Sequence, residues 1–183
     1  MQSIERERGA MASLKQRIAA VEETNGDLLA FARGHAGAVA SIHEAVLALL
    51  PATDLASFTR IVTHDWPCLL GVDAVALAWA CGDRAFVADG SGLRPFEPRL
   101  IARMAGIERA VTAHSVTQGN PLFGLGNKDI RAEITIRLEG ARGLGLLLLG
   151  QHSGEPGETA TSVRLLRFLG RTCSTMLERW PLD

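Results

Sequence analysis

The residue types that carry most enzyme chemistry are present in this sequence, but their spacing matches no catalytic motif. Gly90-Ser91-Gly92 does not have the spacing of a nucleophile elbow. Gly124-x-Gly126 and Gly143-x-Gly145 lack the third glycine and the strand-to-helix context of a dinucleotide site. His64 and Asp65 are neighbours on a predicted helix, so their side chains point apart and cannot act as a dyad. We therefore expect a protein that is not an enzyme.

The sequence also has no strong signal for a metal site, a cofactor site or a membrane segment. The three cysteines (Cys68, Cys81 and Cys173) cannot all pair, and no two of them have the spacing of zinc ligands. The five histidines show no paired ligand spacing either. The opening residues lack the apolar run of a signal peptide, and the aliphatic stretch Leu144–Leu149 is too short for a membrane helix. We expect no metal, no cofactor and no membrane, in a reduced, soluble, cytoplasmic protein.

Composition sets the size of the fold and the kind of partner. The chain has 183 residues, of which 47% are hydrophobic and 21% are charged, so it can bury one globular core. Its net charge is −1. A balanced charge argues against a protein whose main role is to hold nucleic acid or an anionic membrane.

The first fifty residues carry an apolar pattern with a period of about 3.5 residues. Counted in sevens from Ile4 and from Glu7, all positions up to Leu49 are apolar except Glu7, Asn25 and His35. One helix cannot bury such a seam, so the pattern predicts a homodimeric coiled coil. We expect a dimerisation helix over 1–35 and a globular domain over 36–183. The predicted interface residues are Met11, Leu14, Ile18, Val21, Asn25 and Leu28.

Asn25 allows two interpretations. At a seam position it can pair with its symmetry mate and set the register of a continuous helix. Alternatively, Asn25-Gly26 is a turn and Asp27 caps a second helix, so that the two halves form a hairpin. From Leu29 onward the flanking positions become apolar as well, which predicts that the seam widens into a helix lying on the domain core.

The remaining residues predict an α+β domain. Thr53 or Asp54 caps a helix that reaches Leu69, with Pro67 disturbing its last turn. A short helix is expected over Glu97–Ala105 and a closing helix over Thr159–Trp180, and Gly119–Asp129 has the composition of a loop. The predicted strands are Asp73–Ala80, Ala85–Ala88, Ala110–Val116, Ala132–Leu138 and Leu144–Gly150. We expect an antiparallel sheet with its flanking helices on one face.

The last predicted helix has two distinct sides. Its apolar side (Leu166, Leu169, Cys173, Met176 and Trp180) either joins the dimer interface or packs on its own sheet. Arg164, Arg167 and Arg171 lie on a different side, which is either solvated or, in a nucleic-acid-associated protein, the binding surface.

Several segments carry a family resemblance over nearly the whole chain: Val39–Pro51, Gly71–Ala78, Gly119–Gly124, Arg131–Leu138 and Gly145–Gly150. In this order they resemble the bacterial family called domain of unknown function 484, which has a GAF-like fold. The loop over 153–159 departs from the family's pattern, so a ligand bordering that loop would be altered or lost. The resemblance implies a sensory or assembly domain and no settled activity.

A GAF-like fold implies a small-molecule pocket between the sheet and the mid-chain helix and loops. Pockets combine aromatic walls with a few polar anchors. The candidate lining residues are Trp79, Arg94, His114, Phe123 and Arg137. The alternative is that both aromatic residues belong to the core, that His114 lies on the surface and that the arginines are solvated.

Three functions remain open. The first is a homodimeric, non-catalytic regulatory module that binds a small molecule or a protein partner and relays its state through the N-terminal helices. The second is a ligand-free structural adaptor that is also dimeric. The third, which the net charge disfavours, is a nucleic-acid-associated factor.

Overall fold

The computed structural model describes residues 34, 36–107, 109–153 and 160–180. The chain divides into two compact units, Met1–Ala40 and Ser41–Asp183, and the second contains the sheet. The predicted coiled coil and its six interface residues lie outside the described residues. They stay predictions.

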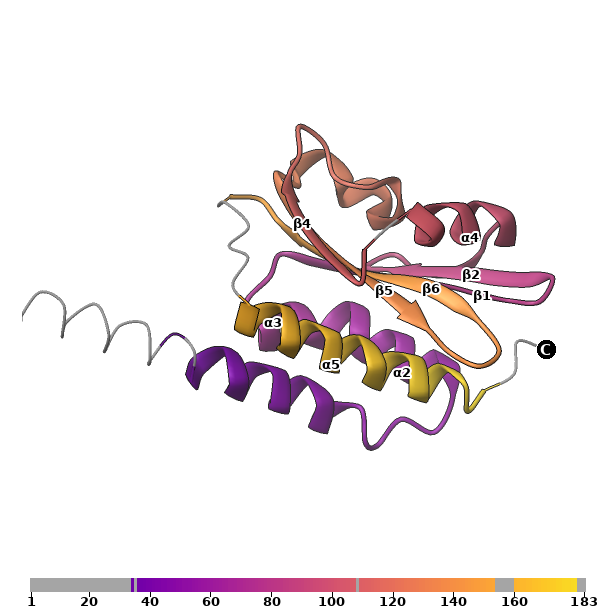
Figure 1. The fold of residues 1–183 in the computed structure, drawn as a ribbon, viewed down its shortest axis with the longest axis horizontal. Coiled ribbons are helices and arrows are strands. Elements are labelled where there is room, and N and C mark those ends of the chain that lie inside the picture. Colours follow the sequence, from indigo (N-terminus) through magenta and orange to yellow (C-terminus); the bar gives the residue numbers. More distant parts are fainter. Residues whose placement is uncertain (1–33, 35, 108, 154–159, 181–183) are drawn as a thin grey trace, which may run out of the picture. The chain divides into compact units, whose positions relative to one another are not determined.

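Six antiparallel strands form one sheet in the order β3-β2-β1-β6-β5-β4 (Figure 1). The five predicted strands are confirmed. The added strand, β3, is a four-residue edge strand that ends in a proline, which cannot donate to a further neighbour. The strands are β1 (Ala74–Cys81), β2 (Arg84–Asp89), β3 (Gly92–Pro95), β4 (Val111–Ser115), β5 (Ala132–Glu139) and β6 (Leu144–Gln151).

The helix before the sheet is continuous but widens in its middle. It consists of α2 (Leu55–Arg60), a π-helical turn η1 (Ile61–Asp65) and α3 (Trp66–Leu70). The Asp54 side chain caps it, accepting the Ser57 N–H at 2.7 Å. Pro67 has no N–H for the carbonyl four residues earlier, and the Trp66 N–H donates five residues back, to Ile61. The predicted disturbance by Pro67 is therefore a π turn.

Helices cover both faces of the sheet, so the expectation of helices on one face is wrong. On the first face lie α2, α3, α5 (Ala160–Leu177) and residues 41–48 of the helix over 36–48; α4 (Pro98–Ile107) and the 3-10 segment η2 (Pro121–Asp129) lie on the second (Figure 1). The physical reason is that β1 and β6 are apolar at successive positions. Consecutive strand residues point to opposite faces, so both faces need cover.

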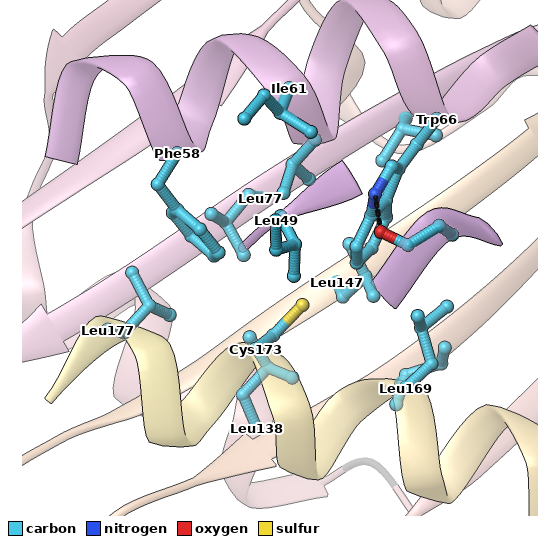
Figure 2. Packing of buried hydrophobic residues seen from close by; sticks show 14 of the residues in the cluster. Leu49, Phe58, Ile61, Trp66, Leu77, Leu138, Leu147, Leu169, Cys173 and Leu177 are labelled. Atoms are coloured by element: carbon cyan, nitrogen blue, oxygen red, sulfur yellow. Dashed lines mark hydrogen bonds between the residues drawn. The ribbon is translucent and has the colours of Figure 1, made fainter. Parts of the chain in front are cut away.

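The first-face core is large and apolar. Phe58, Leu49, Leu77 and Cys173 converge between α2 and α5 in Figure 2. The indole Nε1 of the fully buried Trp66 donates to the Ala45 carbonyl at 2.9 Å, which ties the entering helix to the core. Burial also raises the pKa of the Cys173 thiol, so this cysteine stays protonated and acts as a small apolar residue.

The apolar side of α5 belongs to this same core. Leu169 and Cys173 are fully buried, and Leu166, Met176 and Trp180 pack against the cluster. Of the two alternatives for this helix, the structure shows packing on its own sheet. Leu169 and Cys173 are therefore unavailable to a dimer interface, while Leu166, Met176 and Trp180 stay partly exposed.

Candidate ligand-binding face

The second face of the sheet has an apolar part and a polar part. Over β1, β2 and β6, the helix α4 and the segment η2 pack directly onto the sheet. Their side chains and those of the strands form a closed cluster: Ala76, Ala78, Val87, Ile101, Ala105, Leu122, Phe123, Ile130, Leu146 and Leu148. Each of these side chains is buried, so they form a filled core.

Strands β4 and β5 make the same face polar. Thr112 lies opposite Thr135 and His114 opposite Glu133, and Arg137 follows on β5. Ile134, Ile136 and Leu138 alternate with them and belong to the first-face core. We name the five side chains Thr112, His114, Glu133, Thr135 and Arg137 the polar half-face.

Glu133 connects the polar half-face to η2. Its side chain is almost fully buried, and its Oε1 lies 3.2 Å from His114 Nε2. Its Oε2 accepts the Asn120 N–H at 2.9 Å. The Asn120 side chain in turn accepts the Leu122 N–H at 3.0 Å, at the start of η2. A change at Glu133 or His114 therefore acts directly on the anchoring of η2.

Thr112 carries an unsatisfied polar atom. Its hydroxyl oxygen is buried and has no hydrogen-bond partner in the described part of the chain. Leaving a buried hydroxyl without a partner costs about 1–3 kcal/mol. Nearby, the half-exposed Arg137 guanidinium pairs with Glu139. The polar half-face thus combines an anchored carboxylate, a cationic group and a hydroxyl that lacks an acceptor or donor.

A second polar group lies at the opposite edge of this face. Asp89, 1% exposed, accepts the Ser91 N–H at 2.8 Å and pairs with the Arg94 guanidinium. Burial acts to raise the pKa of Asp89, but the hydrogen bonds from Ser91 and Arg94 outweigh it and hold the pKa below its usual value. Gly124 of η2 lies against this carboxylate at a φ of 64°.

The structure separates the five residues predicted to line one pocket. His114 and Arg137 lie together on the polar half-face. Arg94 is on the same face, at the other edge of the sheet, and Phe123 is part of the filled core. Trp79 is buried in the first-face core, where a Cβ on Gly143 would lie 2.4 Å from its ring. Its grouping with the other four is corrected, because it points to the opposite side of the sheet.

The three further members of the polar half-face were missed from the sequence: Thr112, Glu133 and Thr135. The signal was available on β5, where Glu133, Thr135 and Arg137 alternate with apolar residues over eight positions. Such alternation marks one polar and one apolar face. Within the described residues no cluster of His, Cys, Asp and Glu could hold a metal ion. A search of the same residues finds no helix with the length and apolar character needed to cross a membrane.

Solved structures with this arrangement are GAF domains. The GAF domain of a phosphoenolpyruvate-protein phosphotransferase from Coxiella burnetii aligns with 79% of this chain and over 95% of its own length. The sequence identity is 10% and the TM-score is 0.55. The GAF domain of the Acinetobacter enzyme aligns with 76% of this chain and over 91% of its own length, at 10% identity and a TM-score of 0.51. The chromophore-binding domain of Stigmatella aurantiaca phytochrome P1 aligns with 75% of this chain and over 58% of its own length, at 20% identity and a TM-score of 0.50. The chain spans less than two thirds of the first bacteriophytochromes it matches.

The protein is therefore an α+β domain with a GAF-like fold. The sequence model of the family described as "Protein of unknown function, DUF484" matches residues 5–182, and the chain belongs to that family. The resemblance drawn from the sequence is confirmed. No curated protein matches the chain at a significant level.

Proposed function

We propose that this chain is a non-catalytic, homodimeric regulatory module that binds a small polar molecule on the polar half-face. The observation that carries the proposal is the buried Thr112 hydroxyl without a partner among the described residues, beside Thr135 and Arg137. A domain that only needed a core would place a valine there, because valine has the same shape and no polar atom. A ligand with a hydrogen-bonding group supplies what Thr112 lacks.

The connection to η2 offers a way to report binding. Glu133 holds the Asn120 N–H and faces His114 across the strand pair. A molecule that engages His114 or Glu133 changes the anchoring of η2 and of the core that η2 closes. The state of that core is then passed on through the N-terminal helices to a partner. The chromophore-binding domain of the Stigmatella phytochrome, which has a similar fold, is a precedent for the binding of a small molecule on it.

Native mass spectrometry of the chain purified from its own host tests the binding step. We expect an adduct of metabolite size on the wild type that Thr112→Val and Arg137→Ala each reduce strongly. Arg84→Ala is the matched control, because Arg84 is exposed at the far end of β2. If the wild type carries no adduct, the polar half-face is empty in the cell. The ligand-free adaptor then becomes the better description.

Light scattering tests the homodimer. The double change Leu14→Asp plus Val21→Asp places charges in the predicted seam, and we expect it to give monomers. Ser13→Asp plus Gln16→Asp, at outer positions of the same heptad, is expected to leave the dimer intact. A seam variant that remains dimeric shows that the coiled-coil assignment is wrong.

A further inference from the structure

The outward side of α5 presents a continuous stripe of exposed side chains. It consists of Arg164, Arg167, Phe168, Arg171 and Thr175, and we call it the α5 stripe. Arg164, Phe168, Arg171 and Thr175 are spaced three or four residues apart, and Arg167 lies beside them, so the five side chains cover one side of the helix. Phe168, in the middle of the arginines, is 48% exposed. The opposite side of the helix is buried in the first-face core.

The three arginines of the stripe have no ionic partners within the described part of the chain. The ion pairs among those residues are Asp89–Arg94, Glu133–His114, Glu139–Arg137 and Asp73–His152. None of them involves the stripe. Like charges three and four residues apart on a helix repel each other and lower helix stability by about 0.2–0.5 kcal/mol per pair. The isolated domain therefore carries a small electrostatic cost and a half-exposed aromatic ring at the same place.

Among the described residues, the two acidic groups on the recess beside the stripe are already engaged. Glu178 accepts the Ala141 N–H and, at 3.4 Å, the Arg142 N–H of the β5–β6 hairpin. Glu139 pairs with Arg137. Arg171 and Thr175 line an open recess of about 350 Å³ between α5 and this hairpin, next to the stripe. Within the described part of the chain, the surface thus offers three cations without ionic partners, one half-exposed aromatic ring and a recess that Glu139 and Glu178 also line.

We propose that the α5 stripe docks an acidic amphipathic helix of a partner protein. A helix lying along α5 meets Phe168 with an apolar side chain and the three arginines with Asp or Glu on either side of it. Arginine suits this role because its planar guanidinium binds a carboxylate through two hydrogen bonds. The stretch from Arg164 to Arg171 spans about two helical turns, which matches a partner helix of ordinary length.

A protein helix fits these observations better than a nucleic acid. The chain's net charge is −1, so there is no wider basic field to attract a phosphate backbone. The three arginines also lie beside the half-exposed Phe168, which a phosphate backbone would leave without an apolar contact and a partner helix would cover. A second copy of the stripe is excluded as the partner because arginine would then face arginine.

Fluorescence anisotropy with a synthetic probe tests the docking. The probe is a fluorescein-labelled helical peptide of about 20 residues with leucines along one side and glutamates beside them. A second peptide has glutamine in place of every glutamate, and a labelled oligothymidylate represents nucleic acid. We expect the full chain to bind the glutamate peptide and to bind the other two at least about tenfold more weakly. Raising the salt from about 0.1 to 0.3 M is expected to weaken that binding.

Substitutions in the α5 stripe test whether the peptide binds there. Arg167→Glu plus Arg171→Glu is expected to weaken peptide binding by about tenfold or more, and Phe168→Ala by about fivefold. The matched control is Arg99→Glu plus Arg103→Glu, which changes two exposed arginines at the same spacing on α4. Because Phe168 is half exposed, its variant should keep the wild-type unfolding curve, which separates lost docking from lost folding. Equal binding of both peptides, or equal losses in the two double variants, overturns the proposal. Preferred binding of oligothymidylate through the same arginines replaces it with a nucleic-acid surface.

Discussion

The first face of the sheet and the second face are built from different side chains. The first face, under α2, α3 and α5, holds Phe58, Trp66 and a continuous set of buried aliphatic residues. The second face is closed in the same way only over β1, β2 and β6. Over β4 and β5 it turns polar, with a buried carboxylate and a buried hydroxyl. The two faces share strands, so this difference lies in alternate residues of the same segments.

The contrast between the faces indicates a division of roles within one sheet. An apolar face gains stability with every buried side chain, at about 25 cal/mol per Å² of apolar surface. A face that keeps a buried hydroxyl unpartnered loses stability at that position. The first face therefore holds the fold together. The polar half-face has chemistry that the fold alone does not require.

The largest effect is expected on the first face. Leu147→Ala removes a fully buried side chain from β6, and we expect the free energy of unfolding to fall by about 2–5 kcal/mol. Urea denaturation followed by circular dichroism measures it. Leu125→Ala is the control, because Leu125 is 94% exposed and its loss is expected to leave stability unchanged. A small decrease in the free energy of unfolding for Leu147→Ala would mean that the first face does not contribute most of the stability.

The second largest loss of stability is expected where η2 meets β2. Gly124→Ala places a Cβ 2.5 Å from Asp89 Oδ2 at a φ of 64°, so both space and backbone oppose it. We expect a loss of about 1–3 kcal/mol in the same assay. Gly90→Ala, with open space around its Cβ and no positive φ, is the matched control. Equal unfolding curves for the two variants would show that η2 is not held at Asp89.

The buried carboxylate of Asp89, on β2, predicts that stability depends on pH. The pKa of Asp89 is lower in the folded chain than in the unfolded one. Its contribution to stability is therefore complete above the unfolded pKa and is lost as the pH falls through the folded pKa. Below about pH 4 we expect the wild type to lose more stability than Asp89→Asn. Asp83→Asn, on the exposed β1–β2 turn, should lose as much as the wild type. Parallel curves for the wild type and Asp89→Asn would contradict the assignment.

The smallest change in stability is expected at Thr112, and it tests the difference between the two faces most directly. Thr112→Val removes the unpartnered hydroxyl, and we expect stability to stay equal or to rise by up to about 1 kcal/mol. The same change at Thr63, on the first face, removes a hydroxyl that donates to the Thr59 carbonyl at 2.9 Å. We expect Thr63→Val to cost about 1 kcal/mol. A clear loss at Thr112 would mean that its hydroxyl has a structural partner after all.

Much of the fold was predictable because its elements have strong local signals. The strands β1, β5 and β6 are long apolar or alternating runs, and Asp54 has the side chain and spacing of a helix cap. The segment η2 lies within Gly119–Asp129, whose composition predicts a loop. The position of η2 depends on Asp89 and Glu133, which are distant in sequence. No local pattern contains that information.

The candidate site was only partly predictable for a related reason. In β1, buried on both faces, alternation is absent, so nothing in the run around Trp79 says which face it occupies. In β5 the alternation is plain and groups Arg137 with Glu133 and Thr135. His114 lies on the same side as Arg137, but its pairing with Glu133 is set by the β4–β5 register, which the sequence does not specify.

The π turn before the sheet has a consequence for how this domain tolerates insertions and deletions. At Ile61–Asp65 the helix holds one residue more than a regular α-helix needs for the same rise. Removing one residue there would leave an ordinary helix of about the same rise, with Trp66 still facing the Ala45 carbonyl. Homologues that lack the extra residue can therefore keep a tryptophan bonded in this way, but they should carry a residue other than proline after it, because a regular helix needs that N–H.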